Sequence, residues 1–338
     1  MAAPSSKPYR EVRALLALVA EGHAIEPSHC RHWSAGHLRI IRRQRLGPWL
    51  HVSLRPRADE TLPTSIRDGL KTDYRESVMR TLTREASTRR LLGEFETAGI
   101  PIVVLKGAHL AACLYPDPAM RPMADVDILV QLQDCERARD LLSSMGYAVA
   151  EEPPDEFEEL VRPSLLFGVE GPTGGYLDLH WGLQAMNYYR LSPVVVWEEA
   201  RESSLLGNRA HLFSPEMNFI HVGLHALNHG SWLLNWLDLV LLTRARNMDW
   251  DRLTDLSERL EAARPLYRAL LRLQEEWHVT VPSDTLSRLA RYRARWFEDF
   301  VIRGPYARFW RVCARLRYLP DRRSGLRYIA ARLFRSRR

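Results

Sequence analysis

The segment ADVDILV, residues 124–130, constrains the fold of this chain more than any other segment. It places Asp125 and Asp127 at the start of a run that is otherwise apolar. Alternate side chains of a β-strand share a face, so both carboxylates would point to one side while the apolar residues between and after them point into a core. Two like charges side by side are unfavourable unless a cation lies between them. The segment therefore predicts a strand that presents two carboxylates to a cation.

Length and composition place the chain among soluble globular proteins. Its 338 residues are enough for two or three domains, and its contents of 46% hydrophobic and 26% charged residues are ordinary. No apolar run approaches the roughly 18 to 20 residues that span a bilayer, so we expect no transmembrane segment. The four cysteines are widely scattered, which argues against a disulfide scaffold and favours a reducing, cytoplasmic location.

The net charge of +7 is concentrated in the C-terminal tail. Residues 288–338 contain 16 arginines against three acids, a local balance of +13. Such a tail would contact an acidic partner, which could be nucleic acid, a peptide or an anionic membrane, or it would pack on the body as a solvated amphipathic helix.

Hydrophobic periodicity divides the chain into three parts. Residues 1–98 show apolar residues at helical spacing, residues 99–183 alternate short strands with helices, and residues 184–338 return to helices and end in the basic tail. Within the middle part, LLFGVE and YLDLHW flank the turn segment GPTGG, which predicts a β-hairpin. The expected fold class is α+β, with an α/β core at 99–183 between two helical regions.

The hairpin would bring a third acid to the first two. In YLDLHW, Asp178 and His180 share one face of the strand. If this strand pairs beside ADVDILV, Asp178 joins Asp125 and Asp127. Three carboxylates at a sheet edge form a hard-oxygen site suited to Mg²⁺, with Mn²⁺ as an alternative, and the usual partner of such an ion is a phosphate.

Residues that precede the aspartates would bind that phosphate. The segment VLKG ends a strand and opens a helix, so Gly107 would let the backbone approach a ligand. The helix N-terminus would offer free N–H groups to an anion, and Lys106 would add a mobile charge at the same place. Arg121, shortly before the aspartates, could reach the same phosphates.

These segments together resemble a known family. The order and spacing of LKG, LYPDPAMRPMADVDILV, YLDLHW and HVGLHALNHGSWLLNWLDLV are similar to the uncharacterised nucleotidyltransferase family of the polymerase-β-like superfamily, over about residues 100–242. The resemblance implies a small mixed-sheet nucleotidyltransferase core flanked by helical regions. The wider superfamily has a Gly-Ser turn where this chain has Lys106-Gly107, so the contacts to the triphosphate would differ from that pattern.

The resemblance also implies a reaction. A hydroxyl or similar nucleophile of a small molecule, peptide or protein would attack the α-phosphorus of an NTP co-substrate, most simply transferring AMP, and pyrophosphate would leave. Asp125 and Asp127 would hold the metal ions, and Asp178 would hold the catalytic ion and help to deprotonate the nucleophile. Relatives beside peptide-natural-product genes suggest a role in natural-product biosynthesis.

Three further residues would line the cleft together with His180, according to the family pattern: His225, His229 and Asp238. Residues 221, 225 and 229 also place three histidines four apart, a spacing that can bind zinc, but no glutamate or cysteine completes a set.

Other polar segments carry simpler expectations. His109 is expected to be solvated, and the segment SHCRHW, residues 28–33, is expected to form a loop. The pocket for the acceptor would be built from helices outside the α/β core.

Two alternative functions remain open from the sequence. One is a catalytically idle module that binds a nucleotide or a peptide in the same cleft, although a pure binder would not need Asp178. The other is an RNA-modifying nucleotidyltransferase, which only the basic tail supports. Small-molecule or peptide acceptors are favoured over RNA because the chain shows no RNA-binding motif.

Overall fold

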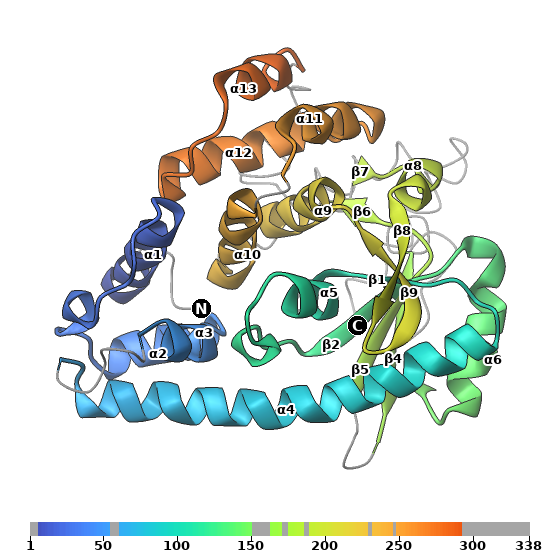
Figure 1. Ribbon diagram of the computed structural model, residues 1–338, viewed down its shortest axis with the longest axis horizontal. Coiled ribbons are helices and arrows are strands. Elements are labelled where there is room, and N and C mark those ends of the chain that lie inside the picture. Colours follow the sequence, from blue (N-terminus) through green and yellow to red (C-terminus); the bar gives the residue numbers. More distant parts are fainter. Residues whose placement is uncertain are drawn as a thin grey trace, which may run out of the picture.

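The computed structural model describes residues 6–54, 61–150, 163–170, 175–185, 189–228, 232–245 and 248–292 (Figure 1). The basic tail that follows lies outside this part of the chain. The N-terminal helices are α1 (Lys7–Ala20), α2 (Ala35–Arg43), α3 (Gly47–Leu54) and α4 (Thr64–Thr97). The C-terminal helices are α9 (Pro215–Asn228), α10 (Leu233–Arg244), α11 (Trp250–Arg259), α12 (Ala263–Trp277) and α13 (Ser283–Leu289). Every described helix is either too short or too polar to span a bilayer.

A mixed seven-stranded sheet lies between the helical regions, with the strand order β3-β4-β5-β2-β1-β9-β8. Its strands are β1 (Val103–Val104), β2 (Asp125–Leu129), β3 (Ala148–Val149), β4 (Ser164–Val169), β5 (Gly175–His180), β8 (Ala200–Leu205) and β9 (Asn208–Phe213). The remaining elements are α5 (Lys106–Cys113), α6 (Cys135–Ser144), α8 (Pro193–Glu198) and a separate pair of strands, β6 (Gln184–Ala185) and β7 (Tyr189–Arg190). This architecture confirms the expected α+β class with a mixed sheet.

The strand pairing follows the predicted hairpin. β4 and β5 pair antiparallel along their whole length, and β5 in turn pairs parallel with β2. β2 also pairs antiparallel with β1, so β2 is a central strand. The segment ADVDILV therefore forms a strand with a neighbour on each side.

The sheet extends beyond residue 183, into a part of the chain that the sequence pattern assigned to helices. β8 and β9 form a hairpin through Leu206 and Gly207, which both have positive φ angles, of 52° and 85°. β9 pairs parallel with β1, which extends the sheet on that side. Periodicity missed this hairpin because β8 is an edge strand whose middle residues are exposed and polar.

The face of the sheet opposite the aspartates packs against helices. Val126, Ile128 and Val130 are buried in a core that also contains Phe95 of α4 and Leu142 of α6. The alternation of acidic and apolar residues in β2 therefore corresponds to one face that carries the acids and one that packs into this core, as expected for a strand.

The N-terminal and C-terminal helices form one body. α1 packs against α10 and α12, and Figure 1 shows α1 beside both. Leu16 of α1 and Trp277 of α12 belong to the same apolar core, and Trp277 stacks on Trp236 of α10. Two segments that are distant in the sequence thus share one core, on the side of the sheet that carries the aspartates.

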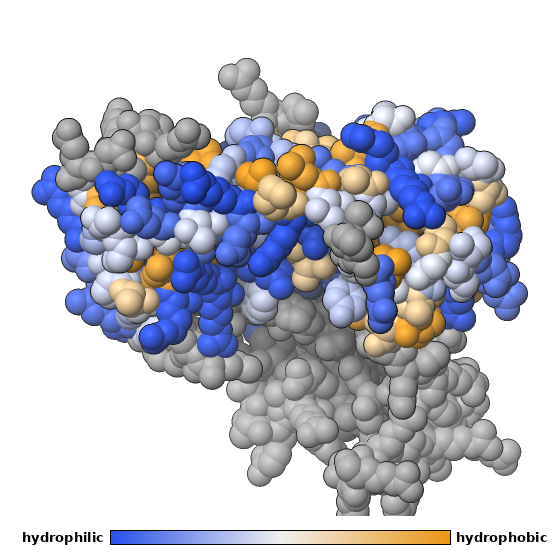
Figure 2. Space-filling view, turned by 90° about the horizontal axis from the view of Figure 1, so that it is seen from below, coloured by the Kyte–Doolittle hydropathy of each residue, from blue (hydrophilic) through white to orange (hydrophobic). Residues whose placement is uncertain are grey.

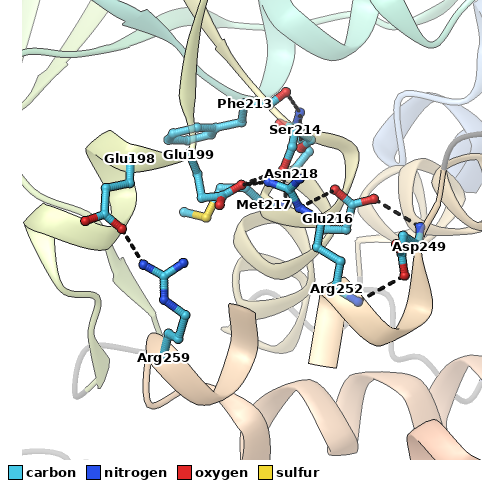
Figure 3. Close-up of polar contacts among 10 residues, drawn as sticks. All are labelled: Glu198, Glu199, Phe213, Ser214, Glu216, Met217, Asn218, Asp249, Arg252 and Arg259. Atoms are coloured by element: carbon cyan, nitrogen blue, oxygen red, sulfur yellow. Dashed lines mark hydrogen bonds and ion pairs between the residues drawn. The ribbon is translucent and has the colours of Figure 1, made fainter. Parts of the chain in front are cut away.

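Ion pairs connect the sheet to this helical body (Figure 3). Glu199, at the end of α8, accepts hydrogen bonds from Ser214 Oγ at 3.0 Å and from Arg252 Nη2 of α11 at 2.6 Å. The same arginine lies 3.5 Å from Glu216 of α9, which also accepts a hydrogen bond from the backbone N–H of Asp249. The β8–β9 hairpin is therefore fixed against α9 and α11.

Gly47 marks a close approach of α3 to α4. A Cβ atom at this position would lie 2.7 Å from the Cβ of Asp73. We expect Gly47→Ala to lower the free energy of unfolding by about 1–3 kcal/mol, because the two helices would have to separate. Gly93→Ala is the matched control, since its Cβ would meet only the side-chain oxygen of Asn208, at 3.3 Å, and alanine favours a helix. Denaturant unfolding measures both variants, and equal stabilities would contradict this packing.

Candidate active site

The three aspartates gather on one face of the sheet. In the parallel register of β2 and β5, Asp127 lies directly opposite Asp178, and Asp125 lies opposite Tyr176. Residues aligned in this way point to the same side. The pairing that the sequence predicted from YLDLHW is therefore present, and it brings the third carboxylate beside the first two.

Two basic side chains lie between these carboxylates. Lys106 Nζ donates a hydrogen bond to Asp127 Oδ1 over 2.9 Å. His180 Nε2 lies 3.1 Å from the same oxygen and 3.2 Å from Asp178 Oδ2. Lys106 and His180 therefore offset part of the repulsion between the acids, which the sequence analysis assigned to a cation.

These contacts set the protonation states of the site. Burial alone would raise the pKa of Asp127, but attraction to Lys106 and hydrogen bonding to His180 hold it well below its ordinary value. Burial would also raise the pKa of Asp178, but the charge and hydrogen bond of His180 outweigh it and lower that pKa. Burial would lower the pKa of His180, yet the two aspartates raise it. Asp125 differs, because burial and the charge of Asp127 raise its pKa.

The start of α5 has an unusual backbone. Lys106 adopts a φ of 36°, in the left-handed region that disfavours side chains with a Cβ atom. Its neighbour Gly107 is tightly enclosed: a Cβ there would lie 3.1 Å from Arg121 Nη1 and 3.3 Å from the Cβ of Met123. The lysine and the glycine therefore bring the backbone of α5 close to the segment that precedes the aspartates.

Arg121 is held by a buried carboxylate. Its Nε and Nη2 donate to the two oxygens of Asp238 over 2.9 and 2.7 Å, and Tyr115 donates its hydroxyl proton to the same residue over 2.6 Å. Asp238 is fully buried, so it lies behind the cleft wall instead of lining the cleft as the sequence suggested. The remaining nitrogen of the guanidinium, Nη1, lies toward Gly107.

A cavity of about 300 Å³ opens above the acids, bounded by the sheet and by α9 and α10. Lys106, Gly107, Arg121 and His225 line it together with the three aspartates. Residue 229 lies outside the described residues, so the structure says nothing of its predicted place in the cleft. Reasoning from sequence missed Arg45, Trp232 and Asn235, which also line this cavity and carry no motif that would have marked them.

The site has ligand atoms for a divalent cation. Carboxylate oxygens of Asp127 and Asp178 lie within 4.8 Å of each other, with a ring nitrogen of His180 beside them. Asp178 Oδ1 is buried and accepts no hydrogen bond from the described residues. A buried carboxylate oxygen without a donor is costly, and a metal ion would satisfy it.

The two histidines that flank the site are buried and neutral. Contrary to the expectation from the sequence, His109 is not solvated: it packs inside the fold near Asn218, and burial lowers its pKa to about 4. Burial, followed by repulsion from Lys106, holds the pKa of His221 well below its ordinary value. Neither histidine lines the cavity above the acids.

A second group of possible ligands, Glu11, His32 and His37, lies among the N-terminal helices. The segment around His32 forms a short 3₁₀-helix, Pro27–Cys30, where the sequence suggested a loop. The backbone N–H of Ser34 donates to His37 Nδ1, so the proton of the neutral ring is on Nε2, which lies 2.6 Å from Glu11. This nitrogen donates to the carboxylate and has no lone pair for a metal.

Comparison with known families identifies the chain. The profile of the family described as "Uncharacterised nucleotidyltransferase" matches residues 31–277. The chain belongs to this family. The match covers the acids, the cavity and most of the helical body, so the nucleotidyltransferase assignment extends well beyond the α/β core.

More distant similarities exist among solved structures. The antibiotic-resistance factor ANT(2'')-Ia is 16% identical, over 52% of this chain and 96% of that one, with a TM-score of 0.33. An antigenic nucleotidyltransferase-like protein from Paracoccidioides brasiliensis is 14% identical, over 60% of this chain and 95% of that one, with a TM-score of 0.38. No curated protein sequence gives a significant match. Scores this low carry no conclusion about substrate.

The strain at Lys106 can be measured with two variants of this residue. Lys106→Gly and Lys106→Ala both remove the ammonium group, so they differ chiefly in backbone freedom. Because glycine adopts positive φ without strain, we expect the glycine variant to be more stable by about 1 kcal/mol. Denaturant unfolding gives the comparison, and a more stable alanine variant would show that residue 106 is not held in the left-handed region.

The Arg121–Asp238 pair gives a second stability prediction. Asp238→Ala would leave the buried guanidinium of Arg121 without a counter-charge, and we expect a loss of about 3–5 kcal/mol. Tyr115→Phe removes only one hydrogen bond to the same carboxylate, so its loss should stay near 1–3 kcal/mol. Unfolding free energies measured side by side decide this, and similar losses in both variants would argue against a dominant role of the ion pair.

Proposed function

We propose that this nucleotidyltransferase moves an NMP, most simply AMP, from an NTP to a hydroxyl or similar nucleophile of a small molecule or peptide, with Mg²⁺ or Mn²⁺ as its cofactor. One observation carries the proposal: the β2–β5 register sets Asp127 opposite Asp178, with Asp125 on the same face and Lys106 beside them. An arrangement of carboxylates next to a basic phosphate site is suited to phosphoryl chemistry that depends on a metal.

The metal would be held by Asp125, Asp127 and Asp178, with His180 beside them. The orphaned oxygen of Asp178 supports this assignment, since the ion would take up its unused lone pairs. A bound divalent ion supplies charge neutralisation for the triphosphate and acidifies the attacking hydroxyl. The carboxylate oxygens are the ligands that Mg²⁺ and Mn²⁺ prefer.

The donor phosphates would bind at the start of α5. Lys106 offers its ammonium group, and Gly107 lets the backbone N–H groups of the first turn approach the triphosphate. Arg121 would point Nη1 at the same phosphates, because Asp238 fixes the other two nitrogens. These groups position the α-phosphorus and stabilise the charge that develops on its oxygens.

The transfer itself is a single displacement at phosphorus. The acceptor oxygen forms a bond to the α-phosphorus while the bond from that phosphorus to the bridging oxygen of the β-phosphate breaks. Pyrophosphate leaves with the electron pair of the broken bond. The hydroxyl proton passes first to Asp178, which is ionised at neutral pH because His180 lowers its pKa, and from there to solvent.

The alternatives carry less support. A purely binding module would have no use for a buried, unsatisfied oxygen on Asp178. An RNA-modifying role depends on the basic tail, which lies outside the described residues. We also propose a cytoplasmic location, since the described cysteines Cys30, Cys113 and Cys135 are free thiols, which persist in reducing compartments.

Calorimetric titration of each NTP, with and without Mg²⁺, tests the donor site. We expect one NTP to bind in a Mg²⁺-dependent way, and Asp127→Asn to weaken that binding roughly tenfold or more, because the variant keeps the volume and removes the charge. Asp140→Asn, an exposed acid on α6, is the matched control and should bind like the wild type. Unchanged Mg²⁺-dependent binding in Asp127→Asn would remove this residue from the metal site.

A further inference from the structure

A second cavity adjoins the cavity above the acids. It has a volume of about 550 Å³ and lies between α2, α3, α4 and the segment Pro122–Ala124. Arg45 and Pro122–Ala124 also line the cavity above the acids, so the two spaces share a wall. The size falls within the range of small-molecule sites. Figure 2 looks onto the face that α4 crosses, where hydrophilic side chains predominate and apolar ones gather in small groups.

Arginine dominates the lining of this second cavity, through Arg42, Arg45, Arg80 and Arg84. Two of these arginines have carboxylate partners inside the same cavity. Arg42 donates to Asp73 over 2.9 Å, and Arg80 donates to Glu76 over 3.2 Å. The charges of the other two arginines, Arg45 and Arg84, are not offset in this way, so the lining carries an excess of positive charge.

Arg45 and Arg84 pair with no carboxylate among the described residues. Arg45 lies over the ring of Trp232, 5.2 Å from its centroid, and Arg84 donates Nη2 to the backbone oxygen of Ala124 over 3.3 Å. A guanidinium stays charged at all ordinary pH values, and its planar fork matches the oxygens of a phosphate or carboxylate. Both arginines thus retain donors for an anion from outside the protein.

The three aspartates line only the first cavity, and the second cavity meets it at Arg45 and Pro122–Ala124. Lys106 contacts Asp127, whereas Arg84 lies within electrostatic reach of Asp125, at the other end of the pair. A transferase needs two substrate sites that meet at one centre, one for the donor and one for the acceptor. The cavity with Lys106 and Gly107 has the groups for the donor phosphates, which leaves the cavity with the arginines for the second substrate.

We propose that this second cavity is the acceptor site, and that the acceptor is a small molecule with an anionic group, a phosphate or a carboxylate, bound by Arg45 and Arg84. The proposal rests on the proposed nucleotidyl transfer. It places the hydroxyl of the acceptor at the acidic centre and its anion at Arg84 of α4 and Arg45 of the segment before α3. The walls come from N-terminal helices, in keeping with an acceptor pocket outside the α/β core.

Anion titrations of the full-length protein test the site without knowledge of the acceptor. Inorganic phosphate and succinate are the probes, and their dissociation constants separate a phosphate-bearing from a carboxylate-bearing acceptor. We expect one probe to bind, and Arg45→Gln and Arg84→Gln each to raise its dissociation constant about fivefold or more, because a charged hydrogen-bond donor is lost. Arg209→Gln, an exposed arginine paired with Glu202 on the outer hairpin, should change it less than about twofold.

Competition with the donor decides which substrate the arginines serve. With Mg²⁺ and saturating α,β-methylene-ATP present, the probe should still bind, and Arg84→Gln should leave the affinity for this analogue unchanged. Displacement of the probe, or a weaker affinity for the analogue in Arg84→Gln, would assign the arginines to the donor triphosphate and overturn the proposal. So would the absence of probe binding to the wild type. Arg84→Lys, which keeps the charge and loses the fork, replaces Arg84→Gln if that variant does not fold.

Failure of the proposed function has a different signature. If no NTP binds to the wild type in the presence of Mg²⁺, the proposed nucleotidyl transfer is wrong, and the proposed acceptor role is wrong with it. The titrations with phosphate and succinate need no nucleotide, so they still report whether Arg45 and Arg84 form an anion site.

Discussion

The parallel register of β2 and β5 is the constraint on which the whole site depends. It sets Asp127 beside Asp178 in a buried setting, where two like charges repel strongly. Lys106 and His180 offset that repulsion through direct contacts. A shift of β5 by one residue would turn Asp178 into the core, and Leu177 and Leu179 toward the cleft. The apolar alternation that stabilises the sheet is therefore also what keeps the carboxylates together.

Helices from both ends of the chain complete the cleft above this register. The N-terminal and C-terminal helices share one apolar core, and that core lies on the acidic side of the sheet. Arg121 and Asp238 connect the segment before β2 to α10 through two hydrogen bonds in a fully buried setting. A displacement of α10 would break a buried ion pair, which is costly, so the walls of the cleft cannot move independently of the acids.

The sequence predicted those parts of the site that depend on local pattern. The alternation in ADVDILV gave the strand and the shared face of its acids, and the segment GPTGG with its apolar flanks gave the hairpin that carries Asp178. The β8–β9 hairpin escaped detection because an exposed edge strand lacks apolar alternation. Asp238 shows a different limit: a lone acid in an apolar helix indicates a buried partner, but only the fold reveals that the partner is Arg121. Arg45 comes from a helix connection far upstream, and no local pattern ties it to the aspartates.

The backbone of Lys106 shows how stability and the proposed chemistry are balanced at this site. A left-handed φ at a residue with a side chain costs about 1–2 kcal/mol, and such strain persists only where the surroundings fix it. Here the ammonium group bonds to Asp127, and the backbone N–H of Leu105 donates to the carbonyl of the same aspartate over 2.9 Å. Glycine at position 106 would relieve the strain, but it would remove the cation that lies between the carboxylates. Backbone strain alone would therefore favour glycine here. The lysine is best explained by the positive charge beside the buried acids, because removing one partner of a buried ion pair costs more than this strain.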